Sequence, residues 1–219
     1  MRLLQGSTIV GARIRTSVPG TNERDRDMAA VNSRMRELST PMPSFDLPDT
    51  VSGEIVSSDG LRGGPAIVVA FICNHCPYVI HVQAELVKLG RDLKALGVPM
   101  VAISSNDATT YPQDGPDKMA ELARLLGFEF PYLYDESQDV ARAFQAACTP
   151  DFFVFDADQR LRYRGQLDES RPGNGKPVTG SDLRAAIEAL LSGRAPAGEQ
   201  KPSIGCSLKW KSGQAPDWA

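Results

Sequence analysis

The stretch "AIVVAFICNHCPYVIH", residues 66–81, decides the fold of this chain. It opens with a continuous apolar, β-branched run, Ala66–Ile72, which is typical of a parallel strand covered on both faces. From Val79 onward the apolar residues recur every three or four positions, which predicts an amphipathic helix. The stretch also holds two of the four cysteines and both histidines. We therefore expect a buried strand that passes through a cysteine pair into a helix.

Further predicted strands and helices follow along the chain, mostly in alternation. The predicted elements are a strand at 98–104, a helix at 116–127, an extended piece at 130–135, a helix at 138–147, a hairpin at 151–165 and a helix at 181–193. This order predicts a layered α/β domain with a mixed sheet. In such sheets the chemistry lies at the carboxyl ends of parallel strands, where the cysteine pair is expected.

Composition divides the chain into one domain with two tails. The charged, turn-rich segment "PGTNERDRD" lacks periodicity, so residues 1–40 are expected to form a flexible N-terminal segment. Residues 41–194 are predicted to be the compact domain, and residues 195–219 a C-terminal tail that carries Cys206. The tail also holds both tryptophans, which makes it a candidate homodimer contact.

Charge and hydropathy exclude several classes of function. The chain of 219 residues is 42% hydrophobic with a net charge of −3, which argues against nucleic-acid and anionic-membrane partners. It has no apolar run of about 18 residues, and its start is too polar for a secretory signal peptide. We expect a cytoplasmic protein, where a close cysteine pair is more often catalytic or metal-binding than structural.

The second cysteine of the pair is the stronger candidate nucleophile. Proline prefers the first position of a helix, so Pro77 makes Cys76 the expected N-cap. A thiolate there faces the positive end of the helix, which lowers its pKa and activates it for disulfide exchange or peroxide reduction. His75 is a candidate source of further positive charge. Cys73, three residues earlier, is a candidate resolving thiol.

Three blocks of sequence carry a resemblance to a known superfamily: "VVAFICNHCPYV", "CTPDFFVFD" and "PSIGCSLKWK". Together they resemble the thioredoxin-fold superfamily, in its redoxin branch of thioredoxin- and peroxiredoxin-like proteins, and an "NHCP" subgroup of that branch. The resemblance implies a thioredoxin-like fold: a central mixed β-sheet flanked by helices, with extra N-terminal strands and a C-terminal tail. It also implies that Thr149-Pro150 is a cis peptide bond in a loop that shapes the substrate groove beside Cys76.

The chain departs from both parent patterns. Counting from Phe71, the thioredoxin nucleophile falls at Cys76, but the thioredoxin resolving position falls at Val79. Peroxiredoxins resemble the chain in their Cys-Pro helix start. They place a hydroxyl residue where this chain has Cys73, and a proline where it has Val69. The resolving thiol therefore stays open, with Cys73, Cys148 and a folded-back Cys206 as the candidates.

Three functions follow from these residues. The first is a thiol-disulfide oxidoreductase that uses Cys76 as nucleophile and Cys73 or Cys206 as resolving thiol. It would act on a protein or small-molecule disulfide with an unidentified electron donor. The second is an antioxidant peroxidase acting through a sulfenic acid at Cys76. Neither function requires a bound cofactor or metal.

The third is a metal-binding or metallochaperone module, whose candidate ligands are Cys73, His75, Cys76 and His81. One further polar residue is expected near the site. Asn106 follows the second buried strand, so it either faces the substrate or forms an ordinary Asx turn.

Overall fold

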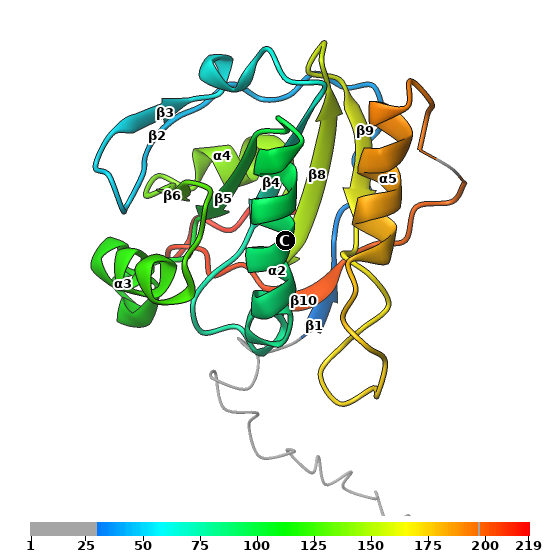
Figure 1. Ribbon diagram of the computed structural model, residues 1–219. Helices are drawn as coiled ribbons and strands as arrows, with labels where there is room; N and C mark the ends of the chain where they lie inside the picture. Colours follow the sequence, from blue (N-terminus) through cyan, green and yellow to red (C-terminus); the bar gives the residue numbers. More distant parts are fainter. Residues whose placement is uncertain (1–29, 197) are drawn as a thin grey trace, which may run out of the picture.

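A computed structural model describes residues 30–196 and 198–219. Its centre is a five-stranded mixed sheet (Figure 1). In spatial order the strands are β6 (Tyr132–Tyr134), β5 (Met100–Ser104), β4 (Ala66–Phe71), β8 (Asp151–Asp156) and β9 (Leu161–Gly165). The predicted alternation of strands and helices and the hairpin are confirmed. The carboxyl ends of β4 and β5 lie at one edge of this sheet because the two strands run parallel.

Strand β4 is central because every one of its side chains is apolar and buried. It pairs in parallel with β5 and antiparallel with β8, so both of its edges are hydrogen-bonded. A parallel neighbour needs a crossover connection, which helix α2 (Pro77–Ala95) supplies. The short segment between Phe71 and Pro77 therefore lies at the carboxyl end of the central strand, in the position expected for a site.

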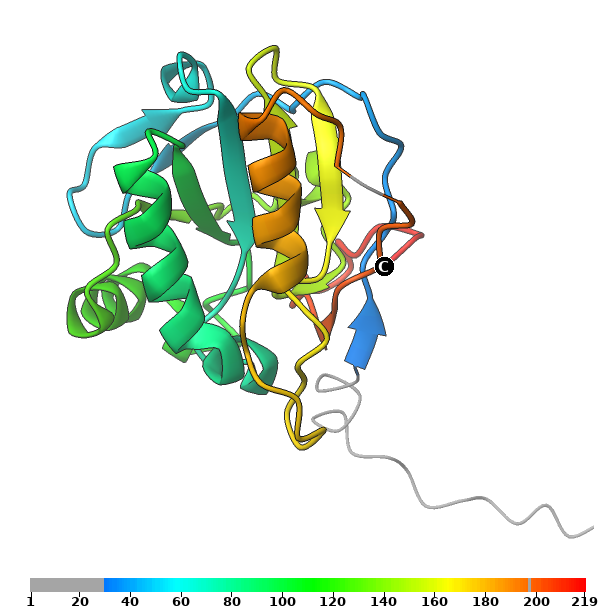
Figure 2. The same ribbon diagram turned by 45° about the vertical axis from the view of Figure 1, so that its right-hand side comes forward.

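Helices cover both faces of the central sheet. Residues of α2, of α3 (Pro116–Leu126) and of α5 (Ser181–Leu191) share one apolar cluster with the sheet. Helix α4 (Asp139–Phe144) belongs to the cluster on the opposite face. Figure 2 shows α2 and α5 side by side in front of the strands. The 3-10 turns η1 (Asp59–Leu61) and η2 (Pro112–Asp114) lie in connecting loops.

A second, three-stranded sheet carries both ends of the described chain. Strand β10 (Ile204–Ser207) lies between β1 (Ala30–Asn32) and β7 (Cys148–Thr149), and both pairings are antiparallel. A separate hairpin joins β2 (Asp46–Pro48) to β3 (Ile55–Ser57). The extra N-terminal strands implied by the family resemblance are therefore present.

This sheet changes the description of the two tails. Residues 30–40 do not fit the predicted flexible segment, because β1 pairs with β10 and Ser33 exchanges hydrogen bonds with Ser203. The earlier part of that segment, residues 1–29, lies outside the described residues. In the C-terminal tail, Cys206 is 1% exposed and Leu208 is 3% exposed, so the part of the tail around β10 belongs to the core.

Aromatic rings fill the face of the sheet that carries α4. Phe153 is fully buried, with ring centroids 5.9 Å from Phe71 and 5.4 Å from Phe144, both in edge-to-face geometry. Such pairs contribute more than the apolar area that they bury. The ring of Phe153 thus joins β8, β4 and α4 at the centre of this cluster.

We predict that Phe153→Ala lowers the free energy of unfolding by about 3–5 kcal/mol, because it removes a fully buried ring and leaves a cavity. Denaturant unfolding measures this loss. The matched control is Leu125→Ala on α3, whose side chain is 79% exposed and should change the free energy by less than about 0.5 kcal/mol. Equal losses in the two variants would contradict the described core.

Candidate active site

The candidate nucleophile lies where the central strand gives way to α2. Pro77 occupies the first turn of the helix and Cys76 is its N-cap, as the sequence predicts. The Cys76 side chain makes no capping hydrogen bond to the helix and is completely buried. Its sulfur is therefore available for contacts away from the helix axis, within the protein interior.

Three cysteines meet at this point and form what we call the thiol cluster: Cys73, Cys76 and Cys206. Cys206 and Cys73 are, in that order, the side chains that act most strongly on the pKa of Cys76. All three thiols are free, and none is more than 1% exposed. The structure thus brings together the three residues that the sequence proposed as catalytic, although Cys206 lies 130 residues from Cys76 in the chain.

Hydrogen bonds in the cluster favour a thiolate at Cys76. The Cys206 thiol, then the Cys73 thiol, hold the pKa of Cys76 well below its usual value, with smaller contributions from Thr149 and the Cys206 backbone N–H. Burial opposes this shift. The Thr149 carbonyl oxygen, 3.1 Å from the Cys76 sulfur, also opposes it because it suits a protonated thiol. The two thiols are the largest causes of the shift, so the cluster favours the thiolate at Cys76 over a thiolate at either neighbour.

The other two members of the cluster remain protonated. The hydrogen bond to Cys76, followed by burial, raises the pKa of Cys73 well above its usual value. The same two causes raise the pKa of Cys206. One negative charge is therefore shared among three sulfurs, with Cys76 as the acceptor and its neighbours as donors.

Cys206 reaches the cluster because β10 approaches the chain around Thr149 very closely. Cys206 is the register partner of Thr149, and the preceding residue is Gly205. A Cβ atom at Gly205 would lie only 2.0 Å from the Thr149 carbonyl oxygen. Only glycine allows this separation, so its absence of a side chain fixes the position of Cys206.

The predicted loop beside the nucleophile is present. Thr149-Pro150 is a cis peptide bond, as the family resemblance implied. The Thr149 side-chain oxygen lies 3.4 Å from the Cys73 sulfur, and its carbonyl oxygen contacts Cys76. Cys148 is buried and directs its sulfur toward the Pro150 carbonyl oxygen at 3.7 Å. It hydrogen-bonds to no cluster cysteine in the described chain.

A carboxylate that the sequence analysis missed lies beside the cluster. The side chain of Asp114, in η2, is fully buried and accepts a hydrogen bond from His75 Nδ1 at 2.6 Å. The His75 ring stacks on Tyr111, with centroids 5.3 Å apart. Asn106 donates to the same carboxylate at 2.8 Å and accepts from the Lys209 backbone N–H. Asn106 thus braces the site instead of forming an isolated Asx turn.

One signal for Asp114 was present in the sequence. The residue follows the second parallel strand, in the same loop as Asn106, and such loops meet at one edge of the sheet. Nothing in its local pattern separates it from the other acidic residues of this loop. Only the folded position of η2 selects it.

The four candidate metal ligands do not converge. His81 Nε2 instead shares a hydrogen bond with Ser170 Oγ at 2.7 Å. Among the described residues, the group with metal-ligand geometry is Cys73, His75 and Asp114, whose ligand atoms lie within 4.8 Å of one another. Both oxygens of Asp114 already accept hydrogen bonds from protein donors. This carboxylate is therefore organised as a hydrogen-bond acceptor.

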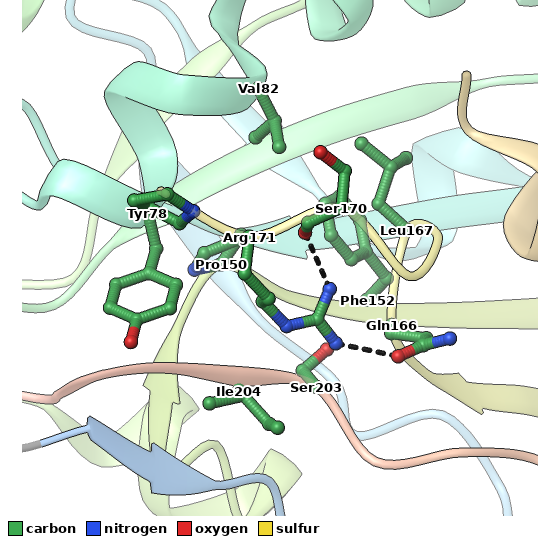
Figure 3. Close-up of a pocket in the computed structure, with 11 residues that line it drawn as sticks. Tyr78, Val82, Pro150, Phe152, Gln166, Leu167, Ser170, Arg171, Ser203 and Ile204 are labelled. Atoms are coloured by element: carbon green, nitrogen blue, oxygen red, sulfur yellow. Dashed lines mark hydrogen bonds between the residues drawn. The ribbon is translucent and has the colours of Figure 1, made fainter. Parts of the chain in front are cut away.

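A small pocket adjoins the cluster (Figure 3). Its walls include Tyr78, Pro150 and Ile204, each one or two residues from a member of the cluster or its partner Thr149. Figure 3 shows the Arg171 guanidinium inside it, bonded to Ser170 and to Gln166. The cavity volume is about 10 Å³, which is room for about one water molecule.

A sequence model of the redoxin family matches residues 37–187 of the chain. The chain belongs to the redoxin family. This membership places it among thiol oxidoreductases and accounts for the thioredoxin-like architecture of its central sheet and helices. No curated protein matches this redoxin.

Solved structures resemble this redoxin at high and at low sequence identity. A protein from Geobacillus kaustophilus is 55% identical, with a TM-score of 0.83 over 84% of this chain and 98% of that chain. A protein from Sinorhizobium meliloti is 45% identical, with a TM-score of 0.81 over 83% and 99%. A thioredoxin-family thiol:disulfide interchange protein from Chlorobium tepidum is 22% identical, with a TM-score of 0.54 over 71% and 99%. That last likeness shows the fold alone.

Among the helices in the described part of this redoxin, none has the length and apolar character needed to cross a membrane.

We predict that Gly205→Ala displaces β10, because the added methyl group would overlap the Thr149 carbonyl oxygen. The variant should lose about 1–3 kcal/mol of stability, and the pKa of Cys76 should rise as the Cys206 donors move away. Denaturant unfolding and thiolate absorbance measure the two effects. Gly60→Ala is the control, since nothing lies within 4 Å of its Cβ position. An unchanged Cys76 pKa in Gly205→Ala would contradict the described contact.

We also predict that Cys76 stays ionised well below the usual thiol pKa of about 8.5. Ultraviolet thiolate absorbance should persist about two pH units lower in the wild type and vanish in Cys76→Ser. Cys206→Ala should raise the transition, because it removes the thiol that lowers the pKa most. A wild-type thiolate that titrates near pH 8.5 would show that the cluster does not stabilise the anion.

Proposed function

We propose that this redoxin is a thiol-disulfide oxidoreductase in which the Cys76 thiolate attacks a disulfide and a neighbouring thiol completes the exchange. The observation that carries the proposal is the thiol cluster itself. Three buried cysteines meet there, and Cys206 and Cys73 are the groups that lower the pKa of Cys76 most, while their own pKa values are raised. A nucleophile and its resolving thiol are the two parts that disulfide exchange requires.

The chemistry follows from this arrangement. Cys76 attacks one sulfur of the substrate disulfide, the substrate S–S bond breaks, and the second substrate sulfur leaves as a thiolate. A mixed disulfide then joins Cys76 to the substrate. A second thiol of the cluster loses its proton and attacks the Cys76 sulfur, which expels the remaining substrate thiolate and closes a disulfide within the chain. An electron donor that carries thiols would restore the three free sulfurs.

Burial of the cluster favours a low-molecular-weight disulfide as the substrate. Cys76 is fully buried, and β10 is hydrogen-bonded on both edges, to β1 and to β7. The backbone beside Pro150 is therefore already paired within the chain, so an extended polypeptide has no free strand edge there. A small molecule needs less opening of this region, and the pocket beside Tyr78, Pro150 and Ile204 marks the nearest gap.

Reduction of peroxides is the second candidate function. Peroxiredoxins use a hydroxyl group beside the nucleophile, and the chain has Cys73 at the equivalent position in sequence. The Thr149 hydroxyl lies 3.4 Å from the Cys73 sulfur, so the fold supplies a hydroxyl to the cluster from another element. In this reaction the Cys76 thiolate attacks one peroxide oxygen, the O–O bond breaks, and the other oxygen leaves as water or an alcohol after taking a proton. The sulfenic acid formed at Cys76 is then attacked by a cluster thiol, which closes a disulfide with loss of water.

We predict that Cys76→Ser abolishes reduction of a small disulfide such as hydroxyethyl disulfide, because a serine hydroxyl is not ionised and cannot form the mixed disulfide. Cys148→Ser is the matched control. It changes another fully buried cysteine whose sulfur bonds outside the cluster, and it should keep most of the activity. Turnover with a thiol reductant present measures both variants. Full activity in Cys76→Ser would exclude the proposal.

The two candidate functions are separated by their oxidant. Turnover of the wild type with hydroxyethyl disulfide supports the oxidoreductase, and consumption of hydrogen peroxide under the same reducing conditions supports the peroxidase. Non-reducing peptide mapping after mild oxidation should show a disulfide between Cys76 and another member of the cluster. A chain that reacts with neither oxidant and forms no such disulfide would overturn both candidates.

A further inference from the structure

Disulfide exchange needs a group that takes the proton of the resolving thiol, and Cys76 cannot serve because it has become the mixed disulfide. One buried carboxylate lies beside the cluster without a role in the steps above. The Asp114 side chain is 0% exposed, and its hydrogen-bonded partner His75 is 17% exposed. The Cys73 sulfur, a carboxylate oxygen of Asp114 and a ring nitrogen of His75 lie within 4.8 Å of one another.

The fold holds this carboxylate in a fixed place. Asp114 Oδ1 accepts the backbone N–H groups of Asn74 at 2.9 Å and His75 at 3.3 Å. Asp114 Oδ2 accepts His75 Nδ1 at 2.6 Å and Asn106 Nδ2 at 2.8 Å. The two backbone donors, Asn74 and His75, lie between Cys73 and Cys76, so the carboxylate is hydrogen-bonded directly to the loop between the cysteines. Such a buried network fixes one geometry when all its members are satisfied.

We propose that the His75–Asp114 pair accepts the proton of Cys73, and that Cys73 is therefore the thiol that resolves the mixed disulfide at Cys76. This inference deepens the proposed function and rests on it. The separation of up to 4.8 Å is one that a rotation of the thiol or a bridging water spans in a general-base step.

Protons and electrons balance in this step. The Cys73 S–H bond breaks, and its proton passes to the imidazole–carboxylate pair, whose net charge changes from −1 to 0 when the imidazole starts neutral. The Cys73 sulfur forms a bond with the Cys76 sulfur, and the bond from Cys76 to the substrate breaks. The substrate leaves as a thiolate. His75 then returns the proton to solvent through its exposed part.

The charge on Cys76 sets the order of events. While Cys76 is a thiolate, its hydrogen bond is the largest cause that raises the pKa of Cys73, so Cys73 keeps its proton. Formation of the mixed disulfide removes that negative charge. The pKa of Cys73 then falls, and proton transfer to the nearby pair becomes favourable only at the stage where a nucleophile is needed.

Cys206 has no comparable acceptor among the groups that shift its pKa. The charged side chains that act on it are Cys76, which is consumed in the mixed disulfide, and Lys209, which lowers the pKa of Cys206 but has no lone pair to take a proton. The Tyr78 backbone N–H also stabilises a Cys206 thiolate without accepting its proton. Cys206 is thus suited to donate a hydrogen bond to Cys76, while Cys73 is suited to attack it.

Other titratable groups near Cys73 do not compete as bases. Burial raises the pKa of the Tyr132 hydroxyl, which donates to Asn74 and stays protonated. Burial likewise raises the pKa of Asp151, but Asp151 is not among the groups that act most strongly on the pKa of Cys73. The Lys209 ammonium lies 5.9 Å from the centroid of the Tyr111 ring, on which His75 also stacks, and it has no lone pair to accept a proton. The His75–Asp114 pair is the acceptor that remains.

A two-phase reaction tests the proposal. All variants carry Cys206→Ser, so that Cys73 is the one cluster thiol left to resolve Cys76. With excess dipyridyl disulfide, attack by Cys76 releases one thiopyridone, and attack by Cys73 on the mixed disulfide releases a second. Asp114→Asn should slow the second phase by ~100-fold or more and leave the first within about threefold. His75→Gln, whose side chain is partly exposed, should also slow only the second phase.

The pH dependence separates a base from a merely structural residue. Without the pair, the proton of Cys73 must go to hydroxide, so the second phase in His75→Gln should rise about tenfold per pH unit over a wide range. Asp135→Asn is the control for Asp114→Asn. It changes another fully buried carboxylate that accepts a backbone N–H, at Ala141, and it should alter neither phase selectively.

The outcomes distinguish the proposed function from the proton-accepting role of the His75–Asp114 pair. Absence of the first phase in the wild-type chain, with Cys206 in place, would overturn the proposed function. A normal first phase with an unchanged second phase in both Asp114→Asn and His75→Gln would overturn the proton-accepting role alone. Retention of the second phase in Cys73→Ser, with Cys206 restored, would assign resolution to Cys206 instead.

Discussion

Backbone pairing between β10 and β7 brings Cys206 onto Cys76, and the rest of the site depends on that contact. The approach is so close that the residue before Cys206 has to be glycine. The contact supplies the thiol that lowers the pKa of Cys76 most, and it also seals the site from solvent. One strand, from the C-terminal end of the chain, thus activates the nucleophile and limits what can reach it.

The protonation states of the three cysteines determine the order in which they react. One negative charge stabilised by two thiols keeps both of those thiols protonated, so neither can act as a nucleophile at the same time as Cys76. Reaction at Cys76 removes the charge and releases its neighbours. Which neighbour then reacts depends on the groups around it: a carboxylate and imidazole beside Cys73, a lysine cation near Cys206.

Sequence patterns located the nucleophile but not its surroundings. The position of Cys76 follows from local rules, because an apolar run, a proline at the first helical position and a periodic stripe each act within a few residues. The partners of Cys76 cannot be predicted from such local rules. Thr149 and Cys206 are 73 and 130 residues away in the chain, and Asp114 looks like any acidic residue of a turn. Cys206, which the sequence places in a C-terminal tail, is buried because β10 is the middle strand of a sheet.

By itself the sequence determined the alternation of strands and helices, the place of the cysteine pair at the end of the central strand and the helix start at Pro77. These features depend on hydrophobic periodicity and backbone preferences, which are local properties of the chain. The tertiary structure decided that β10 pairs with both β1 and β7 beside the site, that three cysteines meet there, and that a carboxylate lies beside Cys73. Those features are contacts between distant segments, and only the folded backbone sets their distances.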